Sequence, residues 1–337
     1  MLNHTPFAAS AGFYRDHQDR NFWGLWVKAA FTLRQNAAPL FLPEGAVLHQ
    51  APLFSSEHPE LLLADADLTS AKERVDLLLT ASASQSPEGK FRQISFRLGA
   101  WCKRLVLAPP LRWDWRGKAV IDRNERAALL PLDARIAYGG ADDVENPLGQ
   151  RNNPAVLYFA DHPGPRRGQA MPPALIGAIP RHWPTRLRLA GTYDETWQTR
   201  RAPCLPHDFQ PAYWQAAPAD QQLERPFRLP SVFDVGGLDD TGPAEGPSCF
   251  PLANLDLICA ARIGGRWKSA DAELQTVSID MVQRRLNLTY LAAWPVPRAA
   301  SDVEFDVTKL SLGSSAGFRV RPQDAHLFSA TAQEPLS

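Results

Sequence analysis

Strict alternation of apolar and polar residues recurs along this chain, and this period of two constrains the fold more than any other feature. The clearest run begins at Phe22, where one set of alternate positions is apolar: Trp23, Leu25, Val27, Ala29, Phe31 and Leu33. The other face carries Lys28, Thr32 and Arg34. Successive side chains of a strand point to opposite sides, so the pattern predicts a half-buried strand. Similar runs at 75–83, 94–98, 255–263 and 277–290 predict a mainly β fold.

Turn residues between these runs predict hairpins. The SPEGK stretch at 86–90 separates the second run from the third, and Gly264-Gly265 separates the fourth from a return strand that begins at Arg266. The polar turn at 280–284 divides the last run into two further strands. Sequential hairpins, without βαβ units, favour antiparallel sandwich-like sheets.

Proline shapes the connections. The chain has 30 prolines in 337 residues, about 9% against a usual ~5%, which predicts long Pro-rich loops and few short helices. One short helix is expected at 209–216, capped by the Asp208 side chain.

Composition narrows the functional classes. Lys plus Arg equals Asp plus Glu at 36 each, so the basic footprint of a nucleic-acid binder is missing. The N-terminus lacks a basic region followed by an apolar one, and no stretch approaches the ~18 apolar residues of a membrane span. We expect a cytoplasmic protein that binds neither nucleic acid nor membrane. Scattered cysteines at 102, 204, 249 and 259 predict buried thiols, with no disulfide framework and no zinc site.

The predicted organisation is one large β-rich domain over 19–321, between a loose segment at 1–18 and a flexible tail at 322–337. The stretch 236–248 is rich in Gly, Pro and acidic residues. It is expected to be a mobile loop or a join between sub-domains near 230–250.

The segment 191–222 combines Gly, Tyr, Asp, Trp, Pro, His and Phe with little apolar periodicity. Its prolines restrict the backbone: Pro203, Pro206, Pro211 and Pro218. Long irregular segments inside domains are uncommon unless they are functional or rigidly packed. We expect a buried, ordered loop rather than an active site.

Cys204, His207 and Asp208 contain the residue types of a nucleophile, a base and an orienting carboxylate. Such triads are assembled from distant segments, whereas these residues are near neighbours in sequence. The favoured interpretation is a helix cap at Asp208 and a hydrogen-bonded loop histidine at His207.

Asp142, Asp143 and Glu145 suggest oxygen ligands for a hard cation, but the spacing of a calcium loop is absent. Turn-capping roles are favoured. Gly139 and Gly140 are expected to adopt backbone conformations closed to other residues. No GK[ST] follows them, so a phosphate-binding loop is not predicted.

Two groups are candidates for partner contacts. Asp65, Asp67, Lys72 and Asp76 form either a polar network that docks a partner or a solvated loop with routine surface pairs. The aromatic residues are either interface platforms or core packing: Trp113, Trp115, Tyr193, Trp197, Tyr213 and Trp214. The interface interpretation concentrates on Trp197 and Trp214.

Motifs of hard chemistry are missing from the sequence. G-x-S-x-G, H-E-x-x-H and the dinucleotide fingerprint do not occur, so we expect no enzyme activity and no cofactor.

Four stretches together carry a resemblance: 64–83, 137–149, 183–194 and the segment 191–222. In this order, over roughly residues 20 to 295, they resemble the family called domain of unknown function 2169 (DUF2169), found in bacterial type VI secretion gene clusters. Glu73 stands where the family often has proline after the lysine, and the pentapeptide-repeat extension of some members is absent.

The resemblance implies a cytoplasmic adaptor or chaperone that binds a toxic effector encoded nearby and helps load it onto the VgrG/PAAR spike. A β-scaffold hydrolase acting on cell-wall or carbohydrate material, with Asp194 and Asp208 as its carboxylate pair, is the alternative. A structural component of the secretion apparatus is a third hypothesis.

The resemblance also implies which residues form the family signature or contact the partner. They are Asp67, Lys72, Asp76, Gly139, Gly140, Asn146, Pro147, Gly149, Gly191, Thr192, Tyr193, Asp194, Trp197, Pro206, Asp208, Phe209, Trp214, Pro218, Asp220 and Gln221.

Overall fold

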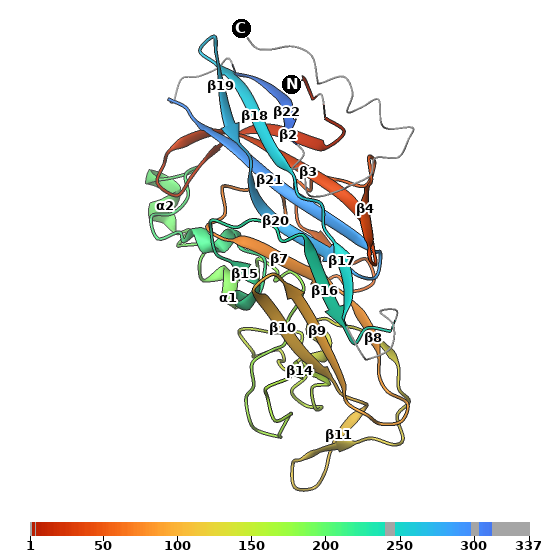
Figure 1. Cartoon of the computed structure of the whole chain (residues 1–337). Coiled ribbons are helices and arrows are strands. Elements are labelled where there is room, and N and C mark those ends of the chain that lie inside the picture. The colour runs from red at the N-terminus through yellow and green to blue at the C-terminus, as the bar shows by residue number, and fades with distance from the viewer. Residues whose placement is uncertain (1, 4, 240–246, 298–302, 312–337) are drawn as a thin grey trace.

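A computed structural model describes residues 2–3, 5–239, 247–297 and 303–311. The expected tail at 322–337 lies outside the described residues. The chain is mainly β, built from antiparallel sheets, long loops and short helices, which confirms the predicted fold class. The larger sheets follow one another along an elongated molecule (Figure 1).

A seven-stranded sheet occupies the middle of the molecule, in the order β15-β7-β20-β21-β3-β2 with β4 also paired to β3. Its strands are β2 (Ala8–Arg15), β3 (Asn21–Arg34), β4 (Ala37–Phe41), β7 (Val75–Thr80), β15 (Gln222–Leu223), β20 (Glu273–Asp280) and β21 (Arg285–Pro295). Strands β3 and β21 pair antiparallel along eleven residues, from Phe22 opposite Pro295 to Thr32 opposite Arg285.

A five-stranded sheet with the order β14-β10-β9-β16-β17 lies below it in Figure 1. Its strands are β9 (Arg92–Leu98), β10 (Trp101–Leu107), β14 (Leu157–Phe159), β16 (Val232–Gly236) and β17 (Ser248–Pro251). A four-stranded sheet at the opposite end contains β1 (Leu2–Asn3), β22 (Val303–Ser311), β18 (Asp256–Ile263) and β19 (Arg266–Asp271).

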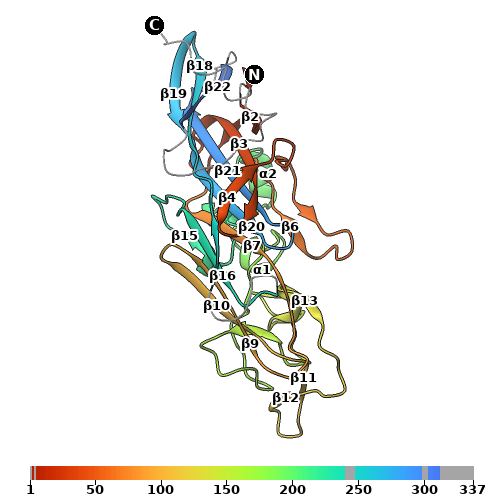
Figure 2. The same cartoon turned by 45° about the vertical axis from the view of Figure 1, so that its right-hand side comes forward.

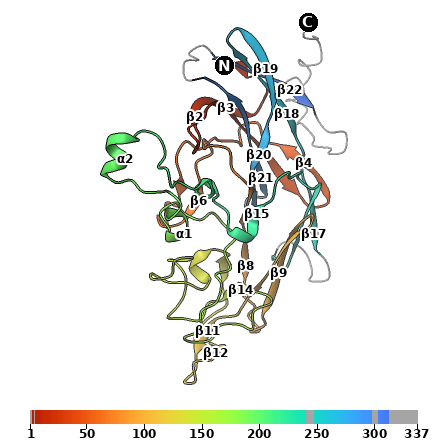
Figure 3. The same cartoon turned by 90° about the vertical axis from the view of Figure 1, so that its left-hand side faces the viewer.

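Short elements complete the described fold. Three two-stranded pairs join β5 (Leu53–Phe54) to β6 (Leu62–Ala64), β8 (Ser82–Ser84) to β13 (Leu129–Pro131), and β11 (Leu111–Trp113) to β12 (Ala119–Ile121). The helices are α1 (Pro184–Leu187), α2 (Glu195–Arg200), η1 (Ala134–Ile136), η2 (Pro211–Trp214) and η3 (Ala219–Gln221). Helix α2 stands out on the side opposite β4 and β17 (Figure 3).

One continuous hydrophobic core joins the middle and lower sheets. It contains Val27 and Phe31 of β3, Leu77 of β7, and Phe96 and Phe233 of the lower sheet. The rings of Phe96 and Phe233 stack with centroids 6.2 Å apart. The apolar face predicted from the alternation in β3 therefore faces this core.

The hairpins at Gly264-Gly265 and at 280–284 are confirmed, since β18 pairs with β19 and β20 with β21. The hairpin predicted across 86–90 is wrong. Strand β7 pairs in parallel with β20, whereas β9 pairs with β10 and β16 in another sheet. Alternation identifies the buried face of a strand but not its partner, and the SPEGK turn joins two sheets instead of two neighbours.

The N-terminal segment also differs from its prediction. Ala8–Arg15, expected to be loose, forms β2 and pairs with β3 residue by residue. Its side chains are mostly half-buried, so the segment lacks the apolar alternation of a strand with one buried face. The long antiparallel ladder with β3 holds it in place (Figure 2).

Candidate functional site

Residues 65–73, which we call the strap, cross the face of the seven-stranded sheet that points away from the core. On this face Trp26 and Lys28 of β3 alternate with core residues such as Val27. The Trp26 indole Nε1–H donates to the Thr69 carbonyl at 3.0 Å. The strap therefore covers side chains that the alternation alone assigns to solvent.

Asp67 anchors the first half of the strap. One carboxylate oxygen accepts from the Lys28 ammonium at 2.8 Å and from the His49 amide at 2.8 Å. The other accepts from the Thr289 hydroxyl at 3.1 Å. Burial and the Lys28 ammonium lower the pKa of His49, against the opposing effect of Asp67.

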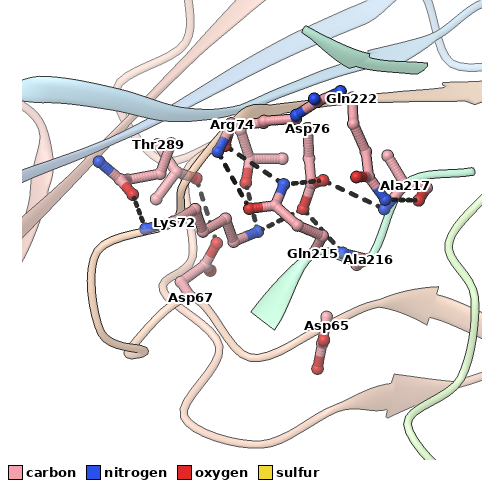
Figure 4. A network of polar contacts seen from close by, with 12 residues as sticks. Asp65, Asp67, Lys72, Arg74, Asp76, Gln215, Ala216, Ala217, Gln222 and Thr289 are labelled. Atoms are coloured by element: carbon pink, nitrogen blue, oxygen red, sulfur yellow. Dashed lines mark hydrogen bonds and ion pairs between the residues drawn. The ribbon is translucent and has the colours of Figure 1, made fainter. Parts of the chain in front are cut away.

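Lys72 and Asp76 anchor the second half (Figure 4). The Lys72 ammonium lies 2.6 Å from an Asp76 carboxylate oxygen and 3.0 Å from the Thr276 hydroxyl. The Lys72 amide donates to Gln275 Oε1 at 2.8 Å. Asp76 is 0% exposed, so this ion pair is removed from water.

The signature segment reaches the same carboxylate from the other side. Asp76 accepts from Gln215 Nε2 at 2.8 Å and from the amides of Ala216 and Ala217 at 2.9 and 3.2 Å. Together with Lys72, these donors give the buried carboxylate four partners (Figure 4). Asp76 thus joins β7, the strap and the signature segment in one polar network.

Gln221 and Asp220 extend the contact to the lower sheet. Gln221 Nε2 donates to the carbonyls of Leu77 and Ile176 at 2.6 and 2.9 Å, and its Oε1 accepts from the Lys103 ammonium at 2.7 Å. Lys103 also pairs with Asp220 at 2.8 Å. Burial lowers the pKa of Lys103, and Asp220 opposes this shift.

Asp65 begins the strap with a separate pair of cations. Its two oxygens lie 2.8 Å from Arg181 Nε and 2.8 Å from Arg186 Nη2. Arg186, almost fully buried in α1, also donates to the Tyr213 carbonyl at 2.7 Å. The four residues thus form three separate groups of contacts rather than one network, and Asp65, Lys72 and Asp76 are buried, so the interpretation as a solvated loop with routine surface pairs is wrong.

A cavity of about 380 Å³ opens above the first half of the strap. Paired polar side chains line its base: Lys28, Asp65, Asp67, Lys72 and Thr289. Leu53, Leu63 and Val282 line it too and are 45%, 58% and 60% exposed. Thr80 and Gln283, also exposed, line the cavity with them. We call it the apolar-rimmed cavity after its three exposed apolar residues.

The GGADDVENPLG loop forms a separate, tightly packed unit. A Cβ on Gly139 would lie 2.1 Å from the Asn146 carbonyl oxygen, and one on Gly149 would lie 2.4 Å from Asn146 Nδ2. Gly139 and Gly140 have φ of +156° and +133°, which confirms the expected glycine conformations. Asn146, fully buried, donates to the carbonyls of Ala134 and Tyr138, both at 2.8 Å.

One of the acidic residues of that loop, Asp143, caps its turn. Asp143 Oδ1 accepts from the amides of Glu145 and Asn146 at 2.9 and 3.0 Å, as predicted for a turn-capping role. Pro147 is half-buried between them and Gly149. Among residues 2–3, 5–239, 247–297 and 303–311, no group of three or more His, Cys, Asp or Glu residues is arranged to hold a metal.

The first part of the signature segment forms an exposed lobe around α2. Asp194 caps α2 by accepting from the Trp197 amide at 2.8 Å, and Asp208 accepts from the amide and hydroxyl of Thr192 at 2.9 and 2.7 Å. Gly191 must be glycine, because a Cβ there would lie 2.8 Å from both Asp208 and Pro206.

Two expectations for this segment are wrong. Residues 192–196 and 198–200 are exposed, whereas a buried loop was expected, because the α2 lobe closes on itself instead of packing into the core. The predicted helix at 209–216 is a 3₁₀ turn at Pro211–Trp214, and Asp208 does not cap it. The commitment of the Asp208 carboxylate to Thr192 explains the missing cap.

The candidate catalytic residues of this segment bind structural partners instead of one another. The Cys204 sulfur accepts from Arg15 Nη1 at 2.6 Å, and Asp208 binds Thr192, so the structure gives Asp208 a capping role rather than that of an orienting carboxylate. Asp194 and Asp208, the alternative hydrolase pair, both hold backbone amides.

The aromatic candidates fall into three places. Trp214 packs against Phe209 with ring centroids 5.5 Å apart, and Trp197 against Tyr193 at 4.7 Å in the α2 lobe. Pro218 is buried beside the Asp76 network. Trp115 is 85% exposed on the β11–β12 hairpin, far along the chain from the signature residues. They do not form one platform.

Several residues of the network were not predicted. Lys28 sits on β3 at a position that alternation assigns to the polar face, which predicts exposure. Lys103 shares a face of β10 with the core residues Leu105 and Leu107, and nothing in the sequence names the partners of its buried ammonium. Arg186 and Gln215 carry no motif of their own. The only signal in the sequence is the unusual number of carboxylates and amides near 65–76 and 215–221, which need buried partners.

With the positions and contacts of these motifs described, the chain can be compared with known proteins. Residues 18–291 match the model of a family described as an uncharacterized protein conserved in bacteria, DUF2169. The chain belongs to the DUF2169 family. No curated protein and no solved structure matches it. Within the described part of this DUF2169 protein, no helix has the length and apolar character needed to cross a membrane.

Proposed function

We propose that this DUF2169 protein is a non-catalytic adaptor of a type VI secretion system. It binds an apolar segment of an effector encoded nearby and delivers the effector to the VgrG/PAAR spike in the cytoplasm. The observation that carries the proposal is the apolar-rimmed cavity, where exposed Leu53, Leu63 and Val282 line the same space as paired polar side chains.

The base of this cavity favours a rigid binding surface over a reaction centre. Asp67 lines the cavity, and Asp76 binds Lys72, which lines it too; both carboxylates accept several hydrogen bonds and face buried ammonium groups. Carboxylates committed in this way hold the strap at a defined position on the sheet. Preorganised surfaces of this kind bind with a smaller ordering cost.

The size of the rim supports binding that is strong enough to protect and weak enough to release. About half of each rim side chain is exposed, so covering them contributes roughly 1 kcal/mol apiece. Exposed apolar patches mark sites of protein interaction. Such a modest apolar contribution leaves room for the spike to compete for the same effector segment.

Co-expression with the neighbouring genes tests the proposal. The double variant Leu63→Asp/Val282→Asp places charges in the rim without touching the core. We expect it to lose the effector from affinity purification and to leave the effector insoluble.

Leu129→Asp is the matched control, because Leu129 is 63% exposed but lies on β13, outside the cavity. It should retain the effector. An effector that is soluble on its own and never co-purifies with the native chain would refute the adaptor role. If the double variant still retained the effector, the binding surface would lie outside this cavity.

A further inference from the structure

A second cavity, of about 250 Å³, lies on the same outer face of the seven-stranded sheet beyond the strap. Ser70, Ala71 and Glu73 of the strap line it, whereas Asp67 and Lys72 line the apolar-rimmed cavity. Along β21, residues 285–289 border the first cavity and residues 291–293 border the second. The strap therefore divides one sheet face into two cavities.

The second cavity, which we call the acidic cavity, has a strong excess of negative charge. Four carboxylates line it against a single arginine, Arg20: Asp16, Glu73, Asp271 and Glu273. Asp16 pairs with Arg20 at 2.7 Å, and Glu273 with Arg225 at 3.1 Å. Within the described residues, Glu73 and Asp271 have no ion pair. These two exposed carboxylates are available to a cation from outside.

Its walls are aromatic. Tyr14 and Phe22 stack with ring centroids 5.3 Å apart on one side, and Trp214 of the signature segment lines the other. Burial raises the pKa of Tyr14, assisted by the nearby Asp16. Low-dielectric aromatic walls strengthen the attraction between a carboxylate and a cation.

The protein already places a guanidinium against this wall. The Arg20 guanidinium carbon lies 5.6 Å from the Phe22 ring centroid, while Arg20 Nε lies 2.7 Å from Asp16. Ring face and carboxylate thus act together on one arginine. Trp214 lines the same cavity as the unpaired Glu73 and Asp271, and its ring already lies 5.3 Å from the Arg181 guanidinium carbon, a second arginine held against an aromatic ring beside this space.

We propose that the acidic cavity binds an arginine side chain of the partner protein. Its volume is below the ~300–1,000 Å³ of small-molecule pockets, which suits one long side chain. Arginine fits better than lysine because its planar guanidinium can contact an aromatic face and carboxylates together. The inference rests on the proposed function only in taking this arginine from a protein partner.

The distance between the two cavities predicts how far apart the arginine and the apolar residue lie in the sequence of the partner. Asn287 borders the first and Leu291 the second, four residues along β21, which is about 13 Å in a strand. An extended partner segment that fills both cavities carries its arginine about four residues from its apolar residue. A partner helix would need a longer separation in sequence.

A peptide titration tests the cation site directly. The probe is acetyl-Gly-Arg-Gly-amide, and its neutral isostere carries citrulline in place of arginine. Binding is followed by the NMR resonance of the Trp214 indole N–H, assigned with Trp214→Phe. We expect a saturable, salt-sensitive shift with the arginine peptide and at least tenfold weaker binding of the citrulline peptide.

Variants locate the site. Glu73→Gln/Asp271→Asn should weaken the arginine peptide about tenfold or more. Glu125→Gln/Asp142→Asn removes the same charge from exposed positions outside the cavity and should leave binding unchanged. Circular dichroism of both double variants checks that the fold is kept.

The outcomes separate the two proposals. Equal shifts with both peptides, or undiminished binding in Glu73→Gln/Asp271→Asn, would overturn the cation site and leave the adaptor role standing. Specific arginine binding by a chain that forms no effector complex would uphold the site and refute the adaptor role.

Discussion

Replacing Asp76 is the sharpest test of how the signature residues act. The carboxylate is 0% exposed and has four donors, one of them the Lys72 ammonium at 2.6 Å. Asp76→Ala leaves a buried ammonium without its counter-ion, which costs about 3–5 kcal/mol. The orphaned amides of the signature segment add about 1 kcal/mol or more. We expect a total loss of roughly 4–6 kcal/mol, comparable with the whole stability of many domains.

Lys72→Met/Asp76→Ala provides the matched comparison. Removing both charges abolishes the unpaired ammonium, so this double variant should be more stable than Asp76→Ala by about 2 kcal/mol or more. The surface pair Arg97–Asp234, whose arginine side chain is 58% exposed, serves as control and should show a coupling energy below about 1 kcal/mol.

Urea unfolding followed by tryptophan fluorescence measures these differences through the midpoint and the slope. A loss below about 1 kcal/mol in Asp76→Ala would refute the reasoning. So would a double variant that is less stable than Asp76→Ala, because the penalty would then not come from an uncompensated ammonium.

Three further predictions concern other parts of the fold. Gly149→Ala should destabilise the protein by about 2 kcal/mol or more, because its Cβ would lie 2.4 Å from Asn146 Nδ2. Gly168→Ala is the comparison: a Cβ there would meet nothing within 4 Å, so it should cost only about 1 kcal/mol. Equal melting temperatures of the Gly149→Ala and Gly168→Ala variants would contradict this prediction. Asp194→Ala should cost about 0.5–2 kcal/mol locally, seen as faster hydrogen exchange in α2; unchanged exchange would remove its capping role. The pKa of Lys103 is lower in the folded protein than its ordinary value of 10.5. Between these two pKa values the unfolded chain therefore binds more protons than the folded chain. Stability should therefore rise with pH through this window, and Lys103→Met should lose the slope; an unchanged slope would exclude Lys103 as its source.

Strand identity was predictable where one face of the strand lies in the core. Alternation from Phe22 located β3, and Gly264-Gly265 located the β18–β19 turn, because both signals are local. Strand β2 was missed because its side chains are half-buried on both faces and show no alternation. Its place comes from backbone pairing with β3, which no side-chain pattern records.

Pairing between distant strands could not be predicted. Strand β7 lies beside β20, about two hundred residues later in the chain, and the two run parallel. Many partners satisfy the same alternating pattern, so the choice depends on how all the sheets close around one core. The nearer turn at 86–90 was the wrong guide for this reason.

In the candidate site, too, local features were predictable from the sequence and long-range contacts were not. The sequence alone marked Asp67, Lys72, Asp76 and the segment 191–222 as unusual, and it placed Gly139 and Gly140 in special backbone conformations. It also predicted the mainly β class from period two and proline content. These are local properties, set by the residue types and their immediate spacing.

Only the tertiary structure decided that Asp76 and Gln215 share a hydrogen bond, and that Lys28 and Lys103 are buried rather than exposed. It also decided that the strap separates an apolar-rimmed cavity from an acidic one. The physical reason is long-range. A buried charge needs a partner within a few ångströms, and for Asp65, Asp76 and Lys103 folding brings such a partner from a segment more than a hundred residues away.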